Sequence, residues 1–241
     1  MSISNTSQSP NPTKRYVEWQ GSEGFFFYYD KEKKEKVKLP KTFQVIALDE
    51  LATIKGYDEG SESGVYSNEV RSTNKEELTV KNFKGDLLAK GLYADIKGNL
   101  KGGKYCKSIY AVTVDKSGVG DLINLQIKGS ALNPWIEGKI NVSGGVVIEC
   151  SINPEQKKKG SNKYFEPTFT VKTLTEGALR DAAIQLDQDV LQPYLEEYLS
   201  GGKKEEVSTS PPQQQKTGLE NFIPPPITGV GDATEIDDLP F

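Results

Sequence analysis

Apolar side chains recur at every second position along several segments of this chain. In residues 122–128, for example, Ile123, Leu125 and Ile127 alternate with polar residues. Successive side chains of a strand point to opposite faces of a sheet, so this period of two predicts strands with one buried face. Because 23 glycines are available for turns and helical periodicity is scarce, the 241-residue chain is expected to be mainly β.

One segment departs from this pattern and predicts a helix over residues 175–199. Its apolar residues, such as Leu186 and Val190, recur at spacings of three and four. Pro193 lacks the N–H that would bond to Asp189, so it should kink the helix or split it in two. The apolar side of this helix is expected to cover one end or the open side of the sheet, or else to pair with a second subunit.

Composition divides the chain into four parts. Residues 1–14 are rich in Ser, Asn, Pro and Thr and are expected to form a disordered arm, whereas residues 15–200 form the folded body. Residues 201–231 are rich in Pro, Gln, Lys and Glu, cannot bury enough apolar surface to offset their ordering entropy, and are expected to be a disordered linker. Residues 232–241 form an acidic tip. Residues 219–241 carry five acidic residues and no Lys or Arg, so the net charge of −4 lies in this tail and the rest of the chain is close to neutral.

Composition also excludes several classes of site. The chain has no histidine and only two cysteines, Cys106 and Cys150, so neither a Cys/His zinc site nor a Ser-His-Asp triad is possible. No apolar run approaches the roughly 20 residues of a membrane span, and the polar N-terminus lacks the apolar stretch of a signal peptide. We therefore expect a cytoplasmic protein that needs no cofactor, metal or membrane.

Two further patterns resemble catalytic sites. Residues 98–104 have the spacing of a phosphate-binding loop, but Tyr105 stands where Ser or Thr would hold magnesium, and a strand pattern follows instead of a helix. A metal-dependent nuclease would need converging carboxylates, and the number of acidic residues is ordinary for a solvated surface. The carboxylates considered for it are Asp49, Glu50, Asp58 and Glu69. We expect no enzymatic activity.

Aromatic and basic residues share the exposed faces of several predicted strands. The clearest predicted hairpin pairs residues 87–97 with residues 104–114 and would gather tyrosines and lysines on one surface. Bases stack on aromatic rings while lysine neutralises phosphate, so this combination is typical of surfaces that bind single-stranded nucleic acid. The candidate contacts are Trp19, Tyr66, Arg71, Lys81, Phe83, Tyr93, Lys97, Lys101, Lys104, Tyr105 and Lys107.

Other aromatic residues leave two interpretations open. Residues 25–29 are five consecutive aromatics followed by lysines, which suits either a strand buried on both faces or a base-stacking surface. Trp135 lies in a connection and could stack on a base or plug the end of a barrel, and we favour the plug. The lysines of residues 157–159 are expected in a loop, where they could contact phosphate or only solvent.

The last five residues of the chain, Asp237, Asp238, Leu239, Pro240 and Phe241, follow the predicted linker. This ending resembles the C-terminal tip of single-stranded DNA-binding proteins, whose bacterial members end in Asp-Asp-Asp-Ile-Pro-Phe. The layout of the body is more similar to phage-encoded members of that class. The resemblance implies an OB-fold body that binds single-stranded DNA and a tip, Asp237 to Phe241, that recruits replication and repair proteins such as a polymerase, helicase or primase.

Together these observations predict a mainly β protein with an OB-fold-like barrel, long insertions, a C-terminal α-helix and an acidic tail. The expected function is to coat and protect single-stranded DNA in replication, recombination or repair, with no enzymatic activity. The alternative is a structural or adaptor β-sandwich, such as a virion component, in which the aromatic residues are core and the tail has no partner.

Overall fold

The computed structural model describes residues 10–142 and 145–201 of the chain. The acidic tip, the predicted linker from residue 202 and residues 1–9 of the predicted arm lie outside the described residues. The strands are β1 (Arg15–Gln20), β2 (Phe25–Asp30), β3 (Glu35–Lys38), β4 (Thr42–Asp58), β5 (Ser63–Ser67), β6 (Leu78–Asn82), β7 (Leu87–Gly91), β8 (Gly103–Asp115), β9 (Gly118–Lys128), β10 (Val146–Lys159) and β11 (Asn162–Thr173). The helical segments are α1 (Tyr93–Ile96), η1 (Lys97–Asn99), η2 (Gly129–Ala131), α2 (Leu132–Glu137), α3 (Ala178–Leu186), η3 (Asp187–Leu191) and α4 (Gln192–Gly201).

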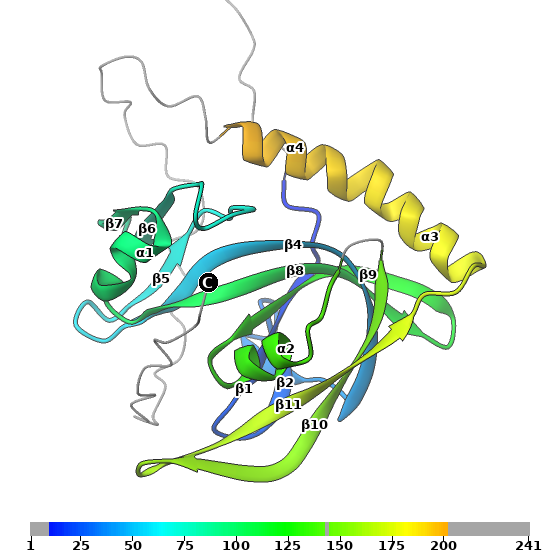
Figure 1. The fold of residues 1–241 in the computed structure, drawn as a ribbon, viewed down its shortest axis with the longest axis horizontal. Coiled ribbons are helices and arrows are strands. Elements are labelled where there is room, and N and C mark those ends of the chain that lie inside the picture. Colours follow the sequence, from blue (N-terminus) through cyan, green and yellow to red (C-terminus); the bar gives the residue numbers. More distant parts are fainter. Residues whose placement is uncertain (1–9, 143–144, 202–241) are drawn as a thin grey trace, which may run out of the picture.

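All of these strands belong to one 11-stranded mixed sheet, which confirms a mainly β protein with a C-terminal helix (Figure 1). The main path runs β3-β2-β1-β9-β8-β4-β5-β6-β7, and β10 pairs with both β4 and β11. Strands β1 and β9 are parallel, whereas β4 pairs antiparallel with β5, β8 and β10. Within the described residues β11 pairs only with β10, so strand pairing leaves the sheet open.

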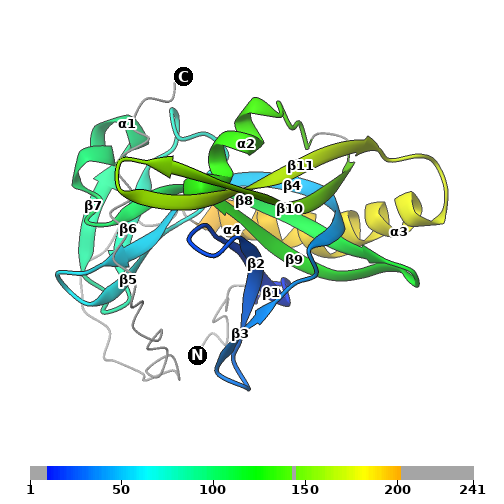
Figure 2. The same cartoon turned by 90° about the horizontal axis from the view of Figure 1, so that it is seen from below.

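The largest core lies on one face of the central strands β4, β8 and β9. Val45, Ile109 and Leu125 contribute to it from these three strands and are fully buried. Strands β10 and β11 and helix α2 cover this face (Figure 2), and Phe26 of the edge strand β2 packs into the same core. Trp135 of α2 is 1% exposed and packs edge-on against Phe169, so this ring is part of the core and not an exposed stacking platform.

The opposite face of the same strands is covered at one end by the C-terminal helix. Ile46 of β4 and Val112 of β8 pack in one buried cluster with Leu191 and Leu195 of the helix. The apolar side of the helix therefore covers part of the sheet, as one of the two sequence interpretations proposed. Figure 1 shows α3 and α4 as one continuous rod across this face.

Pro193 does not split this helix, but the turn before it is irregular. Segment η3 is a π-helical turn, in which the backbone N–H of Gln192 donates to the carbonyl of Asp187, five residues earlier. The wider turn precedes the residue that has no N–H, so the helix passes the proline with its axis continuous. The helix begins at Ala178, three residues after the predicted start.

The predicted hairpin of residues 87–97 with residues 104–114 is wrong. Strand β7 ends at Gly91 and pairs with β6, and the chain then turns into α1 and η1 before β8 begins. The reason is a helical spacing inside the segment. Ile96 and Leu100 are four residues apart and both are buried in the cluster between β4, β5, β6 and α1.

Candidate nucleic-acid interface

Three lysines and a tyrosine form a row across four neighbouring strands. Lys104 of β8 lies directly opposite Lys55 of β4, which lies opposite Tyr66 of β5, which in turn lies opposite Lys81 of β6. Directly opposed residues share one face of a sheet, and strands are about 4.8 Å apart, so this basic row is roughly 14 Å long. It crosses the sheet face whose other end is covered by the C-terminal helix.

Phe83 extends the basic row with an exposed aromatic ring. It follows β6 directly, is 53% exposed, and its ring centroid lies 5.5 Å from that of Tyr66. The ring lies over Gly64, where an added Cβ would come within 2.3 Å of the ring carbon Cε2. A side chain at position 64 would therefore displace Phe83, so the glycine makes room for the ring.

The lysines of the basic row form no ion pair among residues 10–142 and 145–201, although Lys55 acts on Glu18 at longer range. Neighbouring lysines do have one: Lys128 pairs with Glu18, and Lys107 pairs with Glu50. Lys81 and Lys104 are exposed and Lys55 is half-buried, so their ammonium groups present positive charge at the surface. Unpaired charge of one sign on one face creates a local potential that a near-neutral body does not cancel.

The same face continues from the basic row toward β1 and β9. The Nζ of Lys55 lies 5.7 Å from the ring centroid of Tyr16, which is 40% exposed. Beyond it, the Nζ of Lys128 contacts Glu18 at 2.7 Å. Burial raises the pKa of Glu18, but Lys128, Lys55 and Lys36 together hold it below its usual value. Three lysines therefore converge on a single carboxylate, and the face stays positive.

Strands β2 and β3 carry the aromatic run, whose rings divide between the two faces. Phe26 is 1% exposed and packs in the large core against Trp19. Phe25 and Phe27 are each 8% exposed on the other face, with the Nζ of Lys38 3.8 Å and of Lys36 4.6 Å from their ring centroids. All three rings are buried, which favours the core interpretation of this run, while the two lysines remain exposed.

The predicted tyrosine-lysine surface divides between two faces. Tyr105 lies opposite Ile54 and in ring contact with Tyr93 at 5.3 Å, on the face away from the basic row. Burial, and to a smaller degree Glu50, raises the pKa of Tyr105. Lys107 is on that face as well and is paired with Glu50. Lys97 in η1 and Lys101 in the turn before β8 are exposed.

Trp19 lies in the core and is not available to stack on a base. It is 6% exposed, and its indole Nε1 donates to the Oγ of Ser130 and to the carbonyl of Phe165, both at 3.1 Å. The prediction that Trp19 contacts DNA therefore does not fit its position. Phe26 packs against the ring from the neighbouring strand, whereas the hydrogen-bond partners Ser130 and Phe165 are more than 100 positions away and are not indicated by any local pattern.

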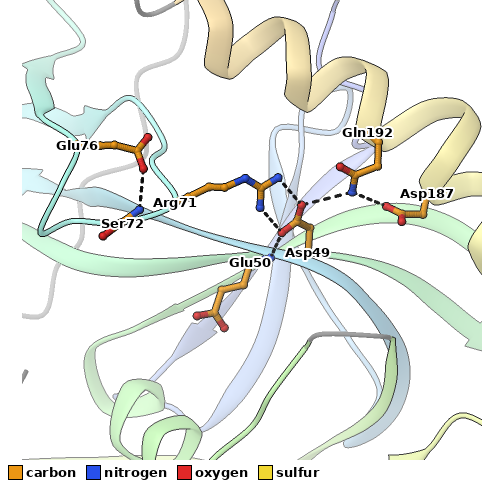
Figure 3. A network of polar contacts seen from close by, with 7 residues as sticks. All are labelled: Asp49, Glu50, Arg71, Ser72, Glu76, Asp187 and Gln192. Carbon is orange, nitrogen blue, oxygen red and sulfur yellow. Dashed lines mark hydrogen bonds and ion pairs between the residues drawn. The ribbon is translucent and has the colours of Figure 1, made fainter.

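Arg71 is held by Asp49 in a network that Figure 3 shows. Both guanidinium nitrogens contact the carboxylate at 2.9 Å, and this carboxylate raises the pKa of Arg71. Asp49 also accepts from the backbone N–H of Glu50 and from the side chain of Gln192, which in turn donates to Asp187. Arg71 therefore joins the loop before β6 to β4 and to the C-terminal helix, a positioning role that leaves few donors for phosphate.

A buried polar cluster separates the basic row from the apolar contacts of the helix. The carboxylate of Glu69 accepts from the Oγ of Ser108 at 2.5 Å and from the Oη of Tyr110 at 2.6 Å. The backbone N–H of Glu69 donates to the Oη of Tyr198 in α4. Burial first, and then Glu69, raises the pKa of Tyr110. These bonds fix the end of the helix beside the wing formed by β5, β6 and β7.

The carboxylates considered for a nuclease do not converge. Asp49 contacts Arg71, Glu50 contacts Lys107 and Asp58 accepts from Ser61, while Glu69 lies in the polar cluster. No group of three or more potential metal-ligating side chains occurs within residues 10–142 and 145–201. None of the helices described there is both long and apolar enough to cross a membrane.

Sequence reasoning missed Lys55, which lies at the centre of the basic row. Lys55 is in none of the strands predicted from the sequence, whereas β4 runs from Thr42 to Asp58. Extending the period of two through Thr53 places Lys55 on the same face of the strand as Thr53 and on the other face from Ile54. This pattern could have indicated the position of Lys55 from the sequence. The pairing of Lys55 with Tyr66 and Lys104 depends on sheet register and is not visible in sequence.

Comparison with known proteins finds no match: no protein-family model, curated protein or solved structure is similar to this chain. The geometry of the described residues therefore carries the functional argument.

Proposed function

We propose that this protein binds single-stranded DNA without catalysing a reaction, and that the basic row with Phe83 is the binding surface. The observation that carries the proposal is the combination of basic and aromatic side chains in this row. Three lysines that form no ion pair among the described residues share one sheet face with the half-buried ring of Tyr66 and the exposed ring of Phe83. This is the chemistry of a sequence-tolerant single-strand site, in which ammonium groups contact phosphates and rings stack on bases.

We also propose that the body is an OB-fold-like barrel with long insertions. Support comes from the large core, to which six strands contribute side chains: β1, β9, β8, β4, β10 and β11. At the open seam the backbone N–H of Phe165 donates to the carbonyl of Gly21, next to the bond from Trp19 to Phe165. The basic row would then lie on the outer surface of the barrel, with β5, β6, β7 and α1 as an insertion beside it.

The proposed partners are single-stranded DNA and, through residues 237–241, replication or repair proteins. The tip lies outside the described residues, so the recruitment proposal rests on its sequence: two carboxylates followed by Leu239, Pro240 and Phe241. An apolar end flanked by acidic groups suits a partner site that combines an apolar pocket with basic residues.

Fluorescence titration with oligo-dT at several salt concentrations tests the proposal. Each phosphate neutralised on a single strand contributes about −0.7 to the slope of log K against log salt, so three lysines should contribute about −2. The triple variant Lys55→Gln, Lys81→Gln, Lys104→Gln should bind more weakly and lose that part of the slope.

A charge-matched control removes three exposed lysines elsewhere: Lys75→Gln, Lys116→Gln, Lys139→Gln. If the control loses as much affinity as the row variant, the positive charge acts without a defined site. If the unmodified protein does not bind oligo-dT at low salt, the proposed function is wrong.

A further inference from the structure

Strands β10 and β11 continue past the sheet as a two-stranded ribbon with a basic tip. Figure 1 shows the ribbon extending from the body, beyond the point where β10 leaves β4. The pairing with β4 ends at Ser151, and a register shift between Ile152 and Gln156 separates the ribbon from the rest of the ladder. Sequence reasoning expected residues 157–159 in a loop, and they instead form the last three residues of β10.

Two lysines of the ribbon face each other across the strands. Lys158 lies directly opposite Lys163, both are exposed, and neither has an ion-pair partner among the described residues. The adjacent Lys157 differs, because its Nζ contacts Glu166 at 2.5 Å. Like charges directly opposed across an antiparallel pair destabilise it, and an anion placed over both ammonium groups would remove that repulsion.

The ribbon differs from the basic row in having no ring available on its lysine face. The ring on that face, Phe165, packs over Gly24, where an added Cβ would lie 2.8 Å from the ring carbon Cγ. A protein surface with ammonium groups and no stacking ring contacts phosphates but not unpaired bases. Duplex DNA suits such a surface because its phosphates lie outside and its bases are stacked inside. Its major groove, about 12 Å wide, admits a two-stranded ribbon.

We propose that the tip of the β10–β11 ribbon, through Lys158 and Lys163, binds the phosphates of duplex DNA that adjoins a single strand held by the basic row. The single-strand half of this inference rests on the proposed function, whereas the duplex half rests on the ribbon alone. The protein would then prefer a junction between single-stranded and duplex DNA to a single strand of the same length.

The two surfaces are connected through the β1–β2 hairpin. Phe165 at the base of the ribbon bonds to Gly21 in the β1–β2 turn. Gln20, the residue before that turn, accepts from the Nζ of Lys36 at 3.3 Å, and Lys36 and Lys55 both act on Glu18. The β1–β2 hairpin therefore contacts the base of the ribbon and also carries Lys36, which acts on the same carboxylate as Lys55 of the basic row.

Binding to three DNAs by fluorescence anisotropy tests this proposal: a hairpin duplex of about 10 base pairs, an oligo-dT of about 10 nucleotides, and the same duplex carrying that oligo-dT as a tail. The junction should bind on the order of tenfold more tightly than the oligo-dT alone at low salt. The double variant Lys158→Gln, Lys163→Gln should lose this excess and bind oligo-dT as the unmodified protein does. Its salt slope on the junction should fall by about 1.8, which is 0.9 for each of two duplex phosphates.

The control Lys75→Gln, Lys116→Gln removes the same charge from two exposed sites outside the ribbon and should keep the junction preference. Equal loss of oligo-dT and junction binding in the ribbon variant would instead place these lysines on the single strand, and the duplex proposal would be wrong. It would also be wrong if the ribbon variant kept the junction preference and only self-associated, since lysines on an edge strand then act against aggregation. If the unmodified protein binds the duplex but not oligo-dT, and the ribbon variant weakens the duplex binding, the proposed function is wrong but the duplex proposal for the ribbon stands.

Discussion

One face of strands β4 and β8 is apolar at one end and basic at the other. At the first end Ile46 and Val112 are fully buried under the C-terminal helix, whereas at the second Lys55 and Lys104 face each other and no element of the described residues covers them. A β-bulge between Ala47 and Asp49 adds one residue to β4, so Ile46 and Lys55 share this face, and the direction of the side chains does not set the difference between the two ends. What covers each end does: the helix makes one end core, and the polar cluster around Glu69 marks where that cover stops. We therefore expect substitutions at the helix-covered end to change the stability of the fold and substitutions at the basic end to change the affinity for DNA.

The largest effect is expected from the helix-covered end. Leu195 is fully buried in the cluster between the helix and the sheet, so Leu195→Ala removes packed atoms and leaves a cavity. We expect the free energy of unfolding to fall by about 2–5 kcal/mol in urea or thermal denaturation. The affinity of the folded variant for oligo-dT should be unchanged within about twofold, because no contact to the basic row is removed.

The control for this change is Leu179→Ala on the same helix, where the side chain is 41% exposed. It should alter stability by no more than about 0.5 kcal/mol. A large loss of oligo-dT affinity in Leu195→Ala, measured under conditions where the variant is folded, would show that the two ends are coupled and that the helix shapes the binding surface.

The opposite pattern is expected at the basic end. Phe83→Ala removes a ring that is 53% exposed and contacts Tyr66, so the fold loses little buried area. Loss of one stacking contact should weaken oligo-dT binding by about 1–3 kcal/mol, measured by titration at fixed salt. The slope of log K against log salt should not change, because no positive charge is removed. Unchanged affinity would mean that bases do not stack on Phe83, and the basic row would then bind phosphate alone.

Local patterns in the sequence predicted the strands and the C-terminal helix, but not which faces of these elements pack against one another. The period of two gave the strands and placed Lys81 and Phe83 on one side of β6, and the helical spacing gave the C-terminal helix. The hairpin at residues 87–97 failed because Ile96 and Leu100 follow a helical period inside a segment in which Leu92, Ala94 and Ile96 also recur at every second position.

The remaining site assignments depended on contacts between distant parts of the chain. Arg71 is neutralised by a carboxylate 22 positions earlier, and Trp19 is buried by Phe165, 146 positions later. The basic row exists only through the register of four strands, and it pairs Lys55 with Lys104, 49 positions later in the chain. Composition could therefore supply the residue types for binding, whereas only the register identifies which of them share a face.

The smallest effect concerns the ion pair that borders the basic row. Both side chains of Glu18 and Lys128 are about three-quarters removed from solvent, at 31% and 25% exposure. The pKa of Glu18 is lowered and that of Lys128 is raised, in each case against the effect of burial. A lowered carboxyl pKa stabilises the fold above the unfolded value of about 4.3, and this contribution is lost as the pH falls through the folded pKa. A raised lysine pKa stabilises the fold below the unfolded value of about 10.4, and this contribution is lost as the pH rises through the folded pKa.

We therefore expect Glu18→Gln to be less stable than the unmodified protein at pH 7 by at most about 1 kcal/mol. The difference should shrink as the pH falls below the unfolded carboxyl value of about 4.3, and it should disappear once the pH is below the lowered folded pKa of Glu18. Urea denaturation between pH 3 and 8 measures both, with Glu59→Gln as a control at an exposed carboxylate. The substitution also removes the carboxylate whose pKa Lys36, Lys55 and Lys128 together lower. The affinity for oligo-dT should therefore rise slightly, and the slope of log K against log salt should steepen. A fall in affinity would mean that Glu18 holds these lysines in place for phosphate, and the border of the basic row would then belong to the site itself.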